Sequence, residues 1–397
     1  MPSVNPNIVR WARETAGFSP EQAASALGLK NTKTRRAVER LAALEEGHEQ
    51  PSRSLLNSMA QKYRRPLVTF YLETPPKAGD RGEDFRNVPD RLKESESLVD
   101  ALVRDVRARQ ATVRDLLLDD GESVGFVNSM NMEQGVDAVL ASIKRTINLE
   151  VAEYRAARSP ESAFALLRSH VESAGIYVLL IGNLGSYHTA ISVEAFRGFA
   201  LADDVAPFVV INDQDAVTAW SFTLLHEVAH LWLGKTGVSG RYSDLKIEKF
   251  CNDVAATFLF PSSELDAVGV TADLPTERIV ELIDEFASAR HLSRTMVAYR
   301  LYRASKISEA DWRTLSAWFL AQWSKARDAK REKQKEGTGP DYYVVRRHRL
   351  GNALLTLVAR NVQEGLLTPT RASKVLGVKP RSVAPLLGLI SSGVEAA

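Results

Sequence analysis

The first 72 residues repeat short helical patterns of apolar side chains, separated by polar breaks. Residues 7–16 place their apolar side chains near one face of a helix, and Gly17 ends it. Ser19 suits the N-cap of a second helix, because Pro20 fits the first helical position and Gln22 follows three residues after the cap. Further helical patterns cover residues 34–46, residues 52–60 and residues 67–71. We therefore expect an all-α, helix-turn-helix-like module over residues 1–72.

The pattern changes twice in the middle of the chain. Residues 73–90 combine prolines and glycines with charged residues, which predicts an extended linker. Long and short helical patterns follow at residues 91–118, 132–147 and 162–174. Four short stretches rich in β-branched and aromatic residues then predict strands at residues 175–181, 189–193, 198–202 and 207–211. Helical patterns resume at residues 219–234, 247–260, 276–287 and 293–303.

The last part of the chain is again helical. Residues 324–337 form a charged run that ends in glycines, which is typical of a solvated helix end or a linker. Residues 349–387 have the spacing of another helix-turn-helix-like segment. The predicted fold class is α+β and mostly α. The predicted divisions are residues 1–72, a linker at 73–90, a sheet-containing domain with a helical lead-in at 91–310, and a helical region at 311–397.

Composition narrows the class of protein and the cellular compartment that we expect. The 397 residues are 45% apolar and 25% charged, as in an ordinary globular protein. A formal net charge of +2 gives no global attraction to nucleic acid, so DNA contact would need a local patch. One cysteine fits a reducing compartment. The N-terminus lacks a signal-peptide pattern, and the apolar stretches are too short to cross a bilayer. We expect a cytoplasmic protein with no membrane partner.

A metal-binding pattern lies on the helix expected at residues 219–234. His226-Glu227-Val228-Ala229-His230 fits the H-E-x-x-H motif. Residues four apart share a face of a helix, so both imidazoles can point at one ion. Glu227 lies one residue further round, where it can act on a water molecule as general base. The apolar neighbours of the motif argue against two unrelated surface histidines.

Two histidines do not complete a catalytic zinc site, which usually has three protein ligands and an open position. Glu248 on the next expected helix is the favoured third ligand. Asn252 stands one turn later on the same face and is expected to orient a ligand or the helix. Rival third ligands also carry carboxylates in this part of the chain: Asp244, Asp253 and Glu264.

These residues resemble the ImmA/IrrE family of metallopeptidases. The likeness rests on the strand 209–212, the motif from His226 to Gly234, Glu248 with Asn252, and the segments 254–256 and 260–261. It extends to residues 63–72 and 84–86, which look like the junction in members with an N-terminal XRE-type helix-turn-helix. The resemblance implies a gluzincin-like fold, with a small twisted sheet on the active-site helix. It also implies His226, His230 and Glu248 as ligands of zinc, with manganese as the alternative metal, and Glu227 as the base.

Known members of that family cleave a helix-turn-helix repressor, and some lie beside toxins. The resemblance therefore implies a regulatory endopeptidase whose partner is a repressor or a toxin-linked protein, in a stress, mobile-element or toxin–antitoxin setting. The alternative is an antitoxin or DNA-binding regulator in which the metal site is structural or self-regulatory. A transcription factor with a degenerate peptidase domain is a third reading, against which the intact motif counts. An oligomer is compatible with any of these.

Other residues carry weaker signals. Tyr187 and His188 lie between two expected strands, where either could donate a hydrogen bond to an oxyanion. Cys251, on the expected ligand helix, is best explained by core packing. Candidate DNA contacts are the basic side chains around the start of the third helical pattern: Lys33, Arg35, Arg36 and Arg40. Neighbouring acidic residues dilute this basic patch, and the same module could bind protein instead.

Overall fold

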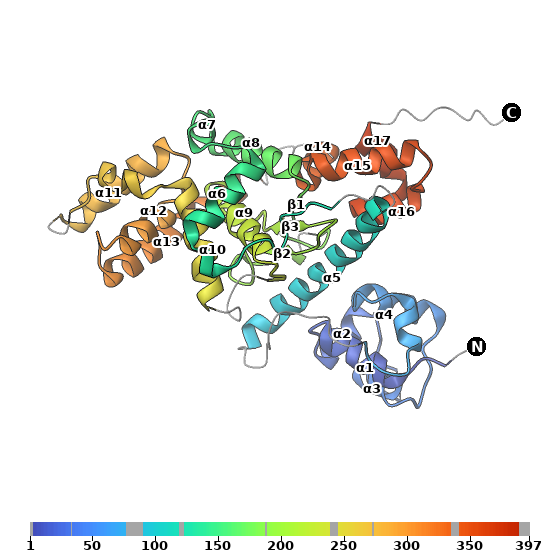
Figure 1. The fold of residues 1–397 in the computed structure, drawn as a ribbon. Helices are drawn as coiled ribbons and strands as arrows, with labels where there is room; N and C mark the ends of the chain where they lie inside the picture. The colour runs from blue at the N-terminus through green and yellow to red at the C-terminus, as the bar shows by residue number, and fades with distance from the viewer. Residues whose placement is uncertain are drawn as a thin grey trace.

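The structure is a computed structural model. It describes residues 3–32, 34–76, 90–118, 123–186, 189–238, 245–271, 274–334 and 341–388. Helices dominate, and a small mixed sheet lies in the middle of the chain (Figure 1). This confirms the α+β, mostly α fold class. Among the described residues, no helix combines the length and apolar character that a membrane-spanning helix needs.

The N-terminal module is all-α and has its own core. Its elements are α1 (Pro6–Thr15), α2 (Pro20–Ala26), α3 (Ala37–Glu45), α4 (Arg53–Lys62) and the 3-10 helix η1 (Leu67–Tyr71). Ile8, Tyr63 and Phe70 are among the side chains fully buried in that core. The expected N-cap is confirmed, because the Ser19 hydroxyl accepts from the Gln22 amide at 3.2 Å and the Gln22 side chain accepts from the Ser19 amide at 2.8 Å.

The third helix begins later than expected. Residues before Ala37 form a turn in which the Arg35 amide donates to the Thr32 hydroxyl at 3.0 Å and the Thr32 amide donates to the Arg35 carbonyl at 2.8 Å. The predicted start at residue 34 is therefore wrong, because Thr32 closes the backbone into a turn that competes with the helix. The resulting connection between α2 and α3, residues 27–36, is longer than the three- or four-residue turn of a helix-turn-helix.

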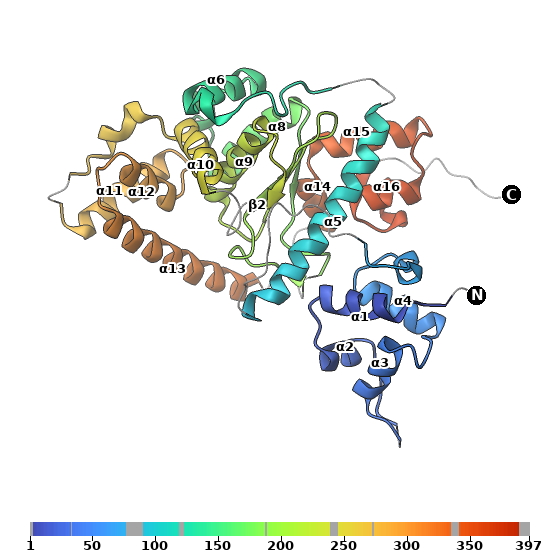
Figure 2. The same ribbon diagram turned by 60° about the horizontal axis from the view of Figure 1, so that its bottom comes forward.

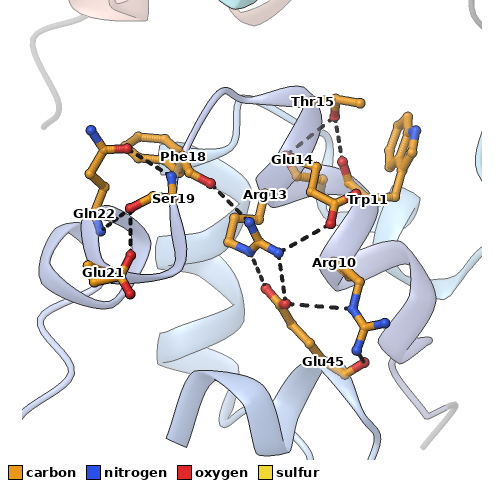
Figure 3. Close-up of polar contacts among 11 residues, drawn as sticks. Arg10, Trp11, Arg13, Glu14, Thr15, Phe18, Ser19, Glu21, Gln22 and Glu45 are labelled. Atoms are coloured by element: carbon orange, nitrogen blue, oxygen red, sulfur yellow. Dashed lines mark hydrogen bonds and ion pairs between the residues drawn. The ribbon is translucent and has the colours of Figure 1, made fainter. Parts of the chain in front are cut away.

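A buried ion pair holds α1 against the end of α3 (Figure 3). Arg13 donates from Nε to Oε1 of Glu45 at 2.6 Å and from Nη2 to Oε2 at 3.1 Å. Its remaining Nη1 donates to the Phe18 carbonyl at 3.0 Å, at the entry to α2. One guanidinium thus ties together the three helices α1, α2 and α3.

The sheet has the strand order β1-β3-β2-β4. Its strands are β1 (Tyr177–Leu180), β2 (Gly198–Leu201), β3 (Phe208–Ile211) and the two-residue β4 (Gly237–Val238). β1 and β3 are parallel, whereas β2 is antiparallel to both β3 and β4. The strand expected at residues 189–193 is wrong: only the isolated bridge Asn183↔Ala190 forms there. The Thr189 hydroxyl accepts from the Leu184 amide at 2.9 Å, which folds this segment back as a loop.

One face of the sheet packs on the central helices of the chain. Alternate strand residues, such as Val178 and Val209, enter a core that these helices share. The helices are α6 (Val136–Ile147), α7 (Val151–Arg155), α8 (Pro160–Ser173), α9 (Val217–Trp232), α10 (Leu245–Leu259), α11 (Thr276–Ala289), α12 (Arg294–Arg303) and α13 (Glu309–Gln334). Short 3-10 helices lie at η2 (Met132–Gln134) and η4 (Ser262–Val268).

The other face carries a second layer. The intervening strand residues, such as Leu179 and Val210, form a core with the long helix α5 and the C-terminal helices. These elements are α5 (Asp90–Leu118), α14 (Tyr342–Leu350), α15 (Asn352–Gln363), α16 (Pro369–Leu376), η5 (Pro380–Ser382) and α17 (Val383–Leu387). Figure 1 shows the sheet between α9 and α10 on one side and α5 with the C-terminal helices on the other.

The predicted boundary at residue 310 falls at the second residue of α13. Leu315 and Phe319 of α13 are buried in the core that includes α9 and α10. The division into domains stays a prediction, but the last 87 residues do not stand apart from the sheet wherever the structure describes them.

A buried pair joins the C-terminal layer to the central helices. Arg168 of α8 donates from Nε to Oε1 of Glu172 at 2.9 Å, and both side chains are nearly inaccessible. The other carboxylate oxygen of Glu172 accepts the amides of Asn352 at 2.9 Å and Ala353 at 3.2 Å, at the start of α15. A carboxylate at a helix N-terminus is stabilised by the free amides there. Glu172 is therefore the N-terminal anchor of α15.

Candidate metal centre

The metal-binding motif lies on α9, a helix buried along most of its length. The apolar neighbours Leu225, Val228 and Leu231 are 1% exposed or less, which explains why the helix lies beneath the sheet. His226 and His230 share one face, and their Nε2 atoms are 3.1 Å apart. Their exposed fractions are 5% and 7%, so both imidazoles meet in a largely dry setting.

Glu248 of α10 faces both histidines. Its Oε2 lies 3.2 Å from Nε2 of His226, and its Oε1 lies 3.3 Å from Nε2 of His230. His226, His230 and Glu248 thus bring one ligand atom each to within 4.8 Å of one another. Two imidazoles and one carboxylate are a donor set of catalytic zinc sites, and three atoms this close leave room for one shared cation. The residues present fit the metal that the motif implies.

The rival carboxylates are engaged elsewhere or lie outside the described residues. Asp253 accepts from Nη2 of Arg303 at 2.7 Å and from the Tyr299 hydroxyl at 3.1 Å. Glu264 accepts from Arg155 and Arg290. Asp244 belongs to the undescribed segment 239–244. Of the three expectations that can be assessed, only Glu248 stands beside the histidines.

The electrostatics of the site reflect three polar groups held together in a buried place. Burial opposes charge on His230, but hydrogen bonds to Cys251 and Glu248 outweigh it and raise the pKa of His230 to about 11. Burial alone would raise the pKa of the Glu248 carboxyl. Its hydrogen bonds with His226 and His230 outweigh burial and bring that pKa well below its usual value. The site therefore stabilises a positive charge between the imidazoles and the carboxylate.

Glu227 lies beside this group, with only 1% of its surface exposed. Gly198 of β2 packs against it: a Cβ on the glycine would lie 2.9 Å from Oε1 of Glu227 and 2.7 Å from Cγ2 of Thr223. The missing side chain at Gly198 is what lets the sheet approach α9 at the site. Nothing in the local sequence identifies this glycine, because the contact joins two elements that are distant in the chain.

The site opens into a cavity of about 570 Å³. His226, Glu227 and Glu248 contribute to its wall, and so does Asn252, one turn after Glu248 as expected. The remaining wall is largely apolar and comes from α9, α12 and α13, with Phe222, Met296, Tyr299, Trp312 and Leu320 as its larger side chains. Sequence reasoning missed the contributions of α12 and α13. The only available signal was the helical spacing of Trp312, Ser316 and Leu320, which is also typical of ordinary core packing.

Arg197 stands in the wall of the cavity, beside the sheet. Its Nη1 lies 3.3 Å from Oδ2 of Asp215, a carboxylate that is almost inaccessible. Burial raises the pKa of Asp215, against the opposing effect of Arg197. Asp215 lies in the short connection between β3 and α9, so the pair fixes the entry to the metal-binding helix.

Cys251 is fully buried, as core packing requires, but it also contacts the metal-site residues. Its thiol is hydrogen-bonded to His230, and burial raises the pKa of that thiol. Cys251 therefore helps to orient one imidazole, a contact that was not expected from the sequence.

The remaining candidates either fall outside the described residues or belong to the N-terminal module. Tyr187, His188 and Lys33 fall outside the described residues. Arg35 and Arg36 lie before α3 and form ion pairs with Glu49 and Glu39, respectively. Arg40, on α3, donates to the Lys30 carbonyl at 3.1 Å.

The comparisons with known proteins bear on this part of the chain. Residues 174–302 match the family of peptidases described as the IrrE N-terminal-like domain (Peptidase_M78). These residues form an IrrE N-terminal-like domain. The matched segment contains the sheet, the motif on α9 and Glu248, and it ends with α12. Comparison with curated proteins and with solved structures gives no match. An IrrE N-terminal-like domain with a two-histidine, one-glutamate triad makes this chain a metallopeptidase.

Proposed function

We propose that the chain is a regulatory endopeptidase that cleaves a partner protein, with His226, His230 and Glu248 holding a zinc ion. The observation that carries the proposal is the position of Glu227, buried beside the triad and in the wall of a peptide-sized cavity. A structural metal site would not need a carboxylate there. Bound zinc supplies Lewis acidity toward a peptide carbonyl and makes water a stronger nucleophile.

Glu227 performs the proton transfers. Its carboxylate takes a proton from the attacking water and delivers it to the leaving amine. Gly198 packs against this side chain and limits where it can lie. The buried surroundings exclude bulk water, so the proton passes between groups of defined position.

The cavity indicates what kind of peptide fits. Its larger side chains, Phe222, Met296, Trp312 and Leu320, are apolar, and Arg197 stands beside them. We infer a substrate with a large apolar side chain next to the bond that is cut. Such side chains are exposed in a partly unfolded or loosely packed partner, which suits a regulatory protein that is inactivated by cleavage.

The setting is part of the same proposal. The resemblance to ImmA/IrrE metallopeptidases favours a repressor or toxin-linked partner in a stress, mobile-element or toxin–antitoxin context. The alternative is an antitoxin or DNA-binding regulator that acts through the N-terminal module. The ion pairs of Arg35 with Glu49 and of Arg36 with Glu39 reduce the net positive charge before α3, which weighs against the alternative.

Metal analysis of the purified protein tests the proposal first. We expect about one zinc per chain in the wild type and a loss of that metal in His226→Ala. The matched control is His170→Ala, since His170 hydrogen-bonds the Ile147 carbonyl away from the site. Absence of metal in the wild type after zinc and manganese supplementation would favour the binding-protein alternative. Cleavage of co-expressed candidate partners, identified by new N-termini in mass spectrometry, then names the substrate.

A further inference from the structure

A second cavity lies on the opposite side of the sheet from the metal centre. Its volume is about 830 Å³, and its wall combines α5, the loop after β1, α14 and the segment from α4 to residue 76. It shares no lining residue with the metal cavity. In Figure 2, α5 runs beside the C-terminal helices, and the N-terminal module lies below them.

The wall of this cavity is strongly basic. It contains a single carboxylate, Asp105, and six arginines: Arg64, Arg65, Arg104, Arg109, Arg346 and Arg349. Asp105 accepts from Nη2 of Arg109 at 2.6 Å, and Arg349 pairs with Asp213 outside the cavity wall at 2.6 Å. Arg65 donates from Nη2 to the Thr15 hydroxyl at 2.8 Å. Positive charges gathered around one space repel one another, and a bound anion lowers that repulsion.

Arg109 gives a second, independent indication of a ligand. Only 9% of its surface is exposed, and its Nε has no hydrogen-bond partner in the described part of the chain. A buried donor without an acceptor is destabilising, and a bound acceptor removes that cost. The side chain packs so closely on Gly377 that a Cβ there would lie 2.4 Å from Nη2, so Arg109 is held in this position.

The rest of the wall is partly apolar. Ala101, Leu102 and Leu350 contribute small and medium apolar side chains, and the loop after β1 contributes two glycines. Three further lining residues are polar: Gln61, Thr69 and Asn183. A volume of this size is typical of cavities that hold small organic ligands. Guanidinium groups suit phosphate oxygens by geometry, and an apolar patch suits a flat ring.

We propose that this cavity binds a nucleoside phosphate. The phosphates lie among the arginines from the two sides of the cavity, and the base packs on the apolar wall. A cavity of about 830 Å³ matches a small organic molecule in size. The site is independent of the proposed peptidase activity and is measured by binding alone.

Titration calorimetry of the full-length protein with ATP and GTP tests the proposal. We expect micromolar binding of at least one nucleotide, weakened about tenfold by Arg346→Gln and by Arg64→Gln, one on each side of the cavity. The matched control Arg371→Gln removes an exposed arginine of the C-terminal layer that does not line the cavity, and it should bind like the wild type. Unchanged zinc content and melting temperature show that the variants are folded.

Hydrogen exchange adds a readout of position. We expect the bound nucleotide to slow exchange in both α4 and α5, because residues of both helices line the cavity. Absence of nucleotide binding at millimolar concentration would overturn the proposal. If inorganic triphosphate bound as tightly as the nucleotides, the proposal would no longer include recognition of the nucleobase. Displacement of the nucleotide by short duplex DNA, with the same dependence on Arg64 and Arg346, would show a nucleic-acid site instead.

Discussion

Gly198 of β2 and Glu227 of α9 are in such close contact that no side chain fits between them: a Cβ on the glycine would lie 2.9 Å from Oε1 of Glu227 and 3.1 Å from its Cγ. The strand thereby fixes where the proposed base stands. We expect Gly198→Ala to displace Glu227 by a few tenths of an ångström or more. Catalytic geometry is sensitive to such shifts, so cleavage should fall by about tenfold or more.

Metal content separates this effect from loss of the site. Because the triad lies on α9 and α10, Gly198→Ala should retain the zinc of the wild type while its turnover drops. Cleavage at the wild-type rate would show that Glu227 is not held by the strand. A simultaneous loss of zinc would show that the substitution disturbs the whole helix.

The second prediction concerns Glu227 itself. Glu227→Gln keeps the size of the side chain but removes its ability to accept a proton, so proteolysis should fall by about 10²–10⁴-fold. Metal binding should persist, since Glu227 is not part of the triad. Glu248→Ala is the companion variant and should lose metal, because it removes one of three ligands. Wild-type cleavage by Glu227→Gln would reject the mechanism, and wild-type metal content in Glu248→Ala would reject Glu248 as a ligand.

The sequence predicts the part of the site that depends on the spacing of neighbouring residues. His226 and His230 share a face of α9 because four residues make about one turn, and Glu248 comes from the next helix. Trp312 and Leu320 line the cavity, and Gly198 contacts Glu227, through packing between elements far apart in the chain, so no local pattern marks them.

The fold likewise combines elements that local sequence predicts with packing that it does not. Strong helical periodicity located α9 and α10 within two residues, and β1, β2 and β3 were found from their β-branched and aromatic residues. The segment 189–193 has strand-like composition, but the Thr189 hydroxyl bonds locally and the chain turns instead. The packing of the C-terminal helices on the sheet could not be foreseen, because their apolar faces fit any partner layer.

The third prediction tests the wall that α13 adds to the active-site cavity. Leu320 lines the cavity and is 43% exposed, so Leu320→Asp should leave the fold intact while placing a charge where an apolar side chain of the substrate would lie. We expect KM for a peptide with a large apolar residue to rise about tenfold, which matches the loss of one buried apolar contact and the cost of meeting a charge.

Trp318→Asp is the matched control for that variant. Trp318 is on the same helix and is equally exposed, but it does not line the cavity. Its peptide kinetics should match the wild type. Equal kinetics for Leu320→Asp and the wild type would show that the substrate does not reach α13.

The fourth prediction concerns how the C-terminal layer is attached. Glu172 pairs with Arg168 and accepts the first two amides of α15, all in a buried place. Glu172→Ala leaves the Arg168 guanidinium buried without its carboxylate and uncaps the helix, so the free energy of unfolding should fall by about 3–5 kcal/mol. Hydrogen exchange should accelerate first in α15, where the two amides lose their acceptor. Glu161→Ala, an exposed position on the same helix α8, is the control and should change neither quantity. If exchange in α15 stays at the wild-type rate in Glu172→Ala, the helix is held by its apolar face alone and the buried pair is not its anchor.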